Sequence, residues 1–108
     1  MMVSAHDAFV TMYYALDAAY ETIKDERLRQ YLSDADPFLF RDGGSADPAV
    51  YIEFERGYCA GAESDVDEES SLALVRDYLG RVGPLFVAAF DSIVNLENWK
   101  TGLAFRSQ

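Results

Sequence analysis

Two Ala-Asp-Pro triplets stand eleven residues apart in the middle of this chain, at Ala35-Asp36-Pro37 and Ala46-Asp47-Pro48. The residue before a proline is held in extended backbone, and proline itself fits the first turn of a helix. Aspartate supplies a side-chain oxygen that accepts a free backbone N–H at a helix start. Each Asp-Pro pair therefore predicts a helix start, with a short turn after Pro37 and a longer helix from Pro48 to about Ala60.

The segment after Pro48 also carries a second pattern. Val50, Ile52 and Phe54 alternate with Tyr51, Glu53 and Glu55. An alternation of this kind is typical of a strand with one buried face. A single strand here has no obvious partner strand elsewhere in the chain, and the preceding Asp-Pro pair predicts a helix cap. We therefore expect residues 49–56 to be helical, with a strand as the open alternative.

Helical spacing of apolar residues covers most of the remaining chain. It predicts further helices over residues 4–23, 67–82, 84–94 and 96–102, the last anchored by Trp99. Residues 26–33 either continue the first helix after a bend or form a helix of their own. The unbroken apolar run of residues 85–90 predicts that its helix is the most buried one. We expect an all-α fold, a compact single-domain bundle of four to five short helices over residues 1–108 with a turn-rich central segment.

Charge and composition exclude several classes of partner. The chain has 19 acidic and 9 basic residues, a formal net charge of −10, and half of its residues are hydrophobic. Nucleic acids and anionic membranes both require clustered lysine and arginine, so neither is an expected partner. The N-terminal residues lack the features of a signal peptide, and no apolar run reaches the roughly 20 residues of a membrane span. A single cysteine is compatible with a reducing compartment, and we expect a cytoplasmic protein.

The central segment contains four aspartates, Asp34, Asp36, Asp42 and Asp47, which are the candidate ligands for a metal ion. Oxygen-rich loops hold calcium or magnesium, but a calcium loop begun at Asp34 would need a glycine where Leu39 stands. Asp36 and Asp47 have a sufficient role as helix caps, and Asp34 and Asp42 are interpreted as turn residues. We expect no cofactor.

Three further side chains are assigned by their position on the expected helices. Cys59 follows Tyr58 beside an expected inner face, which predicts a buried, inert thiol. Tyr14 and Tyr51 fall outside the expected inner faces. Since tyrosine is enriched at protein interfaces, both are candidates for a partner surface.

The central string, residues 32–40 followed by residues 42–50, reads LSDADPFLF and DGGSADPAV. Together with Trp99 near the C-terminus, this string resembles small, acidic bacterial proteins of no assigned function. The resemblance implies a bacterial intracellular protein, and it carries no active site.

Two functions are compatible with these features. The leading hypothesis is a non-enzymatic acidic interaction module that neutralises or regulates a basic protein partner, with self-association as a related possibility. The alternative is a small metal- or ligand-binding enzyme that uses the loop from Asp34 to Asp47. The sequence favours the first, since no catalytic motif accompanies the aspartates.

Overall fold

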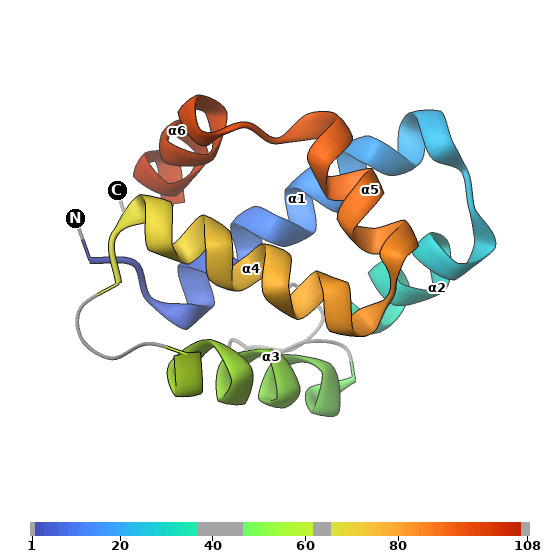
Figure 1. The fold of residues 1–108 in the computed structure, drawn as a ribbon. Coiled ribbons are helices and arrows are strands. Elements are labelled where there is room, and N and C mark those ends of the chain that lie inside the picture. Colours follow the sequence, from blue (N-terminus) through green and yellow to red (C-terminus); the bar gives the residue numbers. More distant parts are fainter. Residues whose placement is uncertain (1, 37–46, 62–65, 107–108) are drawn as a thin grey trace.

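The computed structural model describes residues 2–36, 47–61 and 66–106, and within these ranges it is all-α (Figure 1). The helices are α1 (Ala5–Ile23), α2 (Glu26–Ala35), α3 (Pro48–Gly61), α4 (Glu68–Val82), α5 (Pro84–Ile93) and α6 (Leu96–Arg106). The all-α class is therefore confirmed. The expected count of four to five helices is wrong, because the described residues alone contain six. The turn expected after Pro37 lies outside the described residues.

The boundary between α1 and α2 explains the additional helix. Lys24 adopts the left-handed conformation, with φ 52° and ψ 33°, and its N–H donates to the carbonyl of Tyr20 at 3.1 Å. A left-handed residue of this kind ends a helix. Asp25 then caps α2 by accepting from the N–H of Arg27 at 2.8 Å. Residues 4–33 thus belong to two helices and not to one bent helix.

The start of α3 has the cap that the second Asp-Pro pair predicts. The Ala49 N–H donates to the Asp47 carboxylate at 3.1 Å, and the Val50 N–H donates to the Asp47 carbonyl at 3.0 Å. The helical interpretation of residues 49–56 is therefore confirmed, and the strand alternative is wrong.

Helix α1 lies at the centre of the fold and contacts each of the other described helices (Figure 1). It buries residues on several sides of its axis, namely Ala8, Phe9, Val10, Thr11, Met12, Ala15, Leu16 and Ala19. The expectation that residues 84–94 form the most buried helix is wrong, since α5 buries only Phe86, Ala89 and Phe90. An apolar run gives hydrophobicity but not position, and α1 is buried on more sides because each of the other described helices contacts it.

Two buried hydrogen bonds connect segments that are distant in the sequence. The indole Nε1–H of Trp99 in α6 donates to Ser71 Oγ in α4 at 2.8 Å, and Ser71 donates to the Glu68 carbonyl at 3.0 Å. The Tyr58 hydroxyl in α3 donates to the Val3 carbonyl at 2.9 Å. Burial raises the pKa of Tyr58 to about 12, so this hydroxyl keeps its proton at neutral pH. These bonds satisfy polar groups that would otherwise be costly to bury.

Candidate functional site

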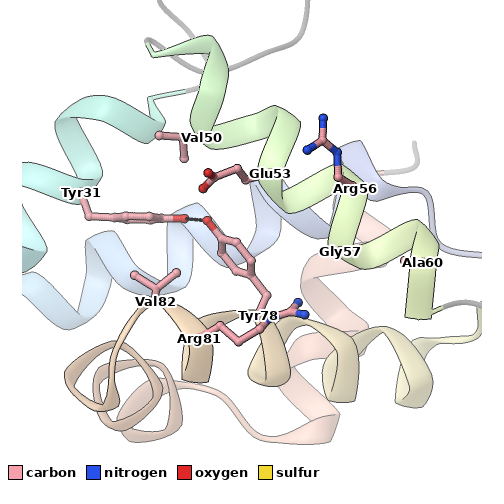
Figure 2. Close-up of a pocket in the computed structure, with 9 residues that line it drawn as sticks. All are labelled: Tyr31, Val50, Glu53, Arg56, Gly57, Ala60, Tyr78, Arg81 and Val82. Atoms are coloured by element: carbon pink, nitrogen blue, oxygen red, sulfur yellow. Dashed lines mark hydrogen bonds between the residues drawn. The ribbon is translucent and has the colours of Figure 1, made fainter.

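A groove of about 580 Å³ opens between α2, α3 and α4 (Figure 2). Its volume lies in the range of small-molecule sites, about 300–1,000 Å³. The side chains that line it are largely apolar but include three charged groups and two phenols. The lining residues are Tyr31, Val50, Glu53, Arg56, Gly57, Ala60, Tyr78, Arg81 and Val82.

Helix α3 forms one wall of the groove with a stripe of side chains beside its buried face. The stripe repeats at spacings of three, four and three residues, which keeps its members on one side of a helix, and it consists of Val50, Glu53, Gly57 and Ala60. Phe54 and Tyr58 form the adjacent buried face and hold α3 against the core. Because Gly57 and Ala60 carry little or no side chain, this side of α3 leaves room for the Arg81 side chain of α4, which lies against Gly57.

The floor of the groove is a pair of tyrosines from α2 and α4. The hydroxyl oxygens of Tyr31 and Tyr78 lie 2.9 Å apart and share a buried hydrogen bond (Figure 2). Their rings are fixed by aromatic neighbours, since Tyr31 packs against Phe86 and Tyr78 packs edge-on against Phe54. One shared bond uses one of the two hydroxyl protons and leaves lone pairs on both oxygens. The floor is therefore rigid and presents hydrogen-bonding capacity to the groove.

The electrostatic potential beside the Tyr31–Tyr78 pair is negative. Burial is the main cause that raises the pKa of Tyr31 well above its usual value; the contact with Tyr78 raises it next, and the charge of Glu53 adds a smaller rise. Burial also raises the pKa of Tyr78, while its hydrogen bond with Tyr31 opposes the rise. At Tyr78 the effect of Glu53 exceeds the opposite effect of Arg81. Both phenols are thus neutral at physiological pH and lie in the field of the Glu53 carboxylate.

The positive charges of the groove lie at its other end. The Arg81 side chain approaches the backbone of Gly57 so closely that a Cβ on that glycine would lie 2.8 Å from Arg81 Nη2. The same Nη2 lies 3.8 Å from the carboxylate of Asp77, so this guanidinium already has an acidic partner. The guanidinium of Arg56 points away from the tyrosine pair (Figure 2). The groove is therefore polarised along its length.

The structure brings two of the four candidate aspartates together, but through the main chain. The Asp47 N–H donates to the Asp34 carbonyl at 2.7 Å, and the Asp34 carboxylate accepts from the Gln30 amide at 3.3 Å. Asp36 is the C-cap residue of α2, and Asp42 lies outside the described residues. Within residues 2–36, 47–61 and 66–106, no three acidic, histidine or cysteine side chains form a group that could hold a metal ion.

Replacing Asp47 by alanine tests its role as a cap. The change removes the acceptor for the Ala49 N–H, so the free energy of unfolding should fall by about 1 kcal/mol. We expect the same loss in urea titrations with and without millimolar magnesium or calcium. Asp34→Ala is the comparison and should change stability by less than about 0.5 kcal/mol. A loss that appears only when the metal is present would contradict the cap assignment and favour a metal site.

The two tyrosines proposed for a partner surface lie in different surroundings. The ring of Tyr51 in α3 packs edge-on against Phe9 in α1, with 5.1 Å between the ring centroids. Burial, reinforced by Glu55, raises the pKa of Tyr51 to about 12. Tyr14 is 39% exposed and lines a smaller hollow of about 220 Å³ with residues of α5 and α6. Neither tyrosine lines the groove, and their role in a partner surface stays a prediction.

The expectation of a buried thiol at Cys59 is wrong, because Cys59 is exposed. Successive residues of a helix point about 100° apart. Tyr58 occupies the buried face of α3, and the next residue is turned to solvent.

The groove was not anticipated from the sequence. Neither Tyr31 nor Glu53 stands out in the sequence as a candidate site residue. The available signal was the α3 stripe of a carboxylate followed by small residues, next to the aromatic pair Phe54 and Tyr58. That stripe indicates a helix face with small side chains, but it does not indicate which helices lie opposite.

No protein-family model, curated protein or solved structure matches this chain. Among the described helices, none combines the length and apolar character needed to cross a membrane.

Proposed function

We propose that this protein is a non-catalytic interaction module that binds a basic protein partner. The observation that carries the proposal is the excess of exposed carboxylates on well-packed helices. In the described part of the chain, four arginines form ion pairs with carboxylates, namely Arg27, Arg29, Arg76 and Arg81. Other exposed carboxylates of this part enter no ion pair, including Asp17, Glu21, Glu55 and Glu97.

A basic partner would reduce the repulsion between these carboxylates. With a formal net charge of −10, the chain repels acidic molecules and attracts basic ones over distances of about 10 Å at moderate salt. Complementary charge accelerates encounter and suppresses wrong partners. A surface of this kind is suited to recognition of a basic protein.

The proposal is tested by affinity capture from a lysate of the host at low and at high salt. We expect the immobilised protein to retain a small set of basic proteins at low salt and to release them at high salt. The matched variant D17N/E21Q/E97Q removes three exposed carboxylates outside the groove and should retain less of the same proteins. Comparison of its unfolding curve with that of the parent chain shows whether reduced capture results from the lost charges or from loss of the folded structure.

Two results would contradict the proposal. One is capture of no salt-sensitive partner at all. The other is equal capture by the parent chain and the triple variant, which would mean that the exposed carboxylates do not contribute to binding.

A further inference from the structure

We propose that the groove between α2, α3 and α4 receives a lysine side chain of the basic partner, with its ammonium group held by Glu53, Tyr31 and Tyr78. This inference rests on the proposed function and assigns it a specific contact. The observations behind it are the placement of the acceptors, the sign of the charge around them and the shape of the walls.

The acceptors match an ammonium group in number and kind. A lysine ammonium has three N–H donors and no acceptor. Glu53 contributes a carboxylate on the groove wall, and the tyrosine pair contributes two phenolic oxygens with lone pairs beyond their 2.9 Å shared bond. The tyrosines are 9% and 6% exposed, so their hydroxyls are fixed in place before a ligand arrives. A preorganised set of acceptors costs little ordering on binding.

The charge around these acceptors favours a cation over an anion. Glu53 acts on both phenols and outweighs Arg81 at Tyr78. Arg81 is engaged with Asp77 at 3.8 Å, and Arg56 points away from the hydroxyl pair (Figure 2). A carboxylate or phosphate placed at the floor would therefore meet Glu53 without a facing arginine.

The walls suit the aliphatic part of a lysine. Val50 of α3 and Val82 of α4 line the groove near the tyrosine pair (Figure 2). A lysine buries its carbon stem along apolar surface while its charged end reaches a polar site. The open groove of about 580 Å³ has room for one such side chain and the backbone that presents it.

The test uses a nine-residue peptide of glycine and serine with one central lysine, and a control peptide with norleucine in its place. Norleucine keeps a straight carbon chain and removes the ammonium. We expect the full chain to bind the lysine peptide measurably in an NMR titration and the norleucine peptide at least about tenfold more weakly, as for the loss of a charge-assisted hydrogen bond.

Two variants of α3 distinguish binding in the groove from general electrostatic attraction to the acidic surface. Glu53→Gln removes the carboxylate from the groove and should weaken lysine-peptide binding by about tenfold or more. Glu55→Gln removes the same charge two residues away, outside the groove, and should weaken it by less than about twofold. Tyr78→Phe keeps the ring, removes one hydroxyl and should lower affinity several-fold. Unfolding curves of all three variants establish that each remains folded.

The proposal is overturned if the two peptides bind equally or if the two glutamate variants have the same effect. If n-butylammonium alone binds as tightly as the peptide, the groove is a site for a small amine, and the proposal that it receives a lysine of a protein partner is overturned. The groove assignment can fail while the proposed function stands. If Glu53→Gln keeps full capture of the salt-sensitive partner while D17N/E21Q/E97Q loses it, the groove assignment falls and the acidic module stands.

Discussion

Replacement of Trp99 by alanine is expected to lower the free energy of unfolding by about 3–5 kcal/mol, the usual loss for a buried aromatic side chain. Trp99 is 1% exposed, its ring packs edge-on against Phe90 at 5.6 Å, and its indole N–H is bonded to Ser71. The variant loses apolar packing between α6 and the core and leaves a cavity. Since small domains have a total stability of about 5–15 kcal/mol, the loss should be visible as a large shift of the urea midpoint.

Ser71→Ala separates the hydrogen bond from the packing at this position. It leaves the indole N–H of Trp99 buried without its acceptor, which should cost about 1–3 kcal/mol while the ring stays in place. Ile52→Ala, at a site that is 49% exposed, is the control and should cost less than about 0.5 kcal/mol. A Trp99→Ala variant as stable as the Ile52→Ala control would contradict the position of α6 in this fold.

Replacement of Phe54 by alanine is expected to have an effect of similar size, about 3–5 kcal/mol, but with a local consequence as well. Phe54 is fully buried, and its ring contacts Phe9, Tyr58 and Tyr78. Helix α3 buries only Phe54 and Tyr58, so it should loosen from the core before the rest of the molecule unfolds. Amide hydrogen exchange should therefore increase in α3 more than in α1.

The same variant should also change the groove. Phe54 packs edge-on against Tyr78, so its removal should weaken the burial that keeps the phenol pKa high. Spectrophotometric titration should then show tyrosines ionising at lower pH than in the parent chain. Unchanged tyrosine titration together with unchanged exchange in α3 would contradict the described packing of α3.

Local rules were sufficient for the parts of the fold that depend on a few neighbouring residues. The Asp-Pro pair before α3 predicted its start, because capping and the restriction before proline act within a single turn. The 3.6-residue spacing predicted the all-α class, and Trp99 is buried in the last helix, as expected. The cap and the helical class follow from interactions within one helix, and the burial of a large aromatic side chain follows from its hydrophobicity.

Long-range arrangement was predicted poorly. Residues 84–94 have the longest apolar run, yet α1 lies at the centre, because burial depends on how many helices surround an element. The groove has the same origin, since Tyr31 and Tyr78 are 47 residues apart and meet only because the tertiary fold brings these side chains of α2 and α4 together beside α3. Sequence spacing within α3 indicated a face of low bulk but not its opposite wall.

The most direct test of the account is to map backbone amide shifts while the single-lysine peptide is titrated into the labelled chain. We expect the shifts to concentrate on residues 31, 50–57 and 78–82, around the Tyr31–Tyr78 pair and Glu53. Absence of shifts at these residues, or shifts spread evenly over the acidic residues of α1, α4 and α6, would contradict the assignment of the groove as the contact site.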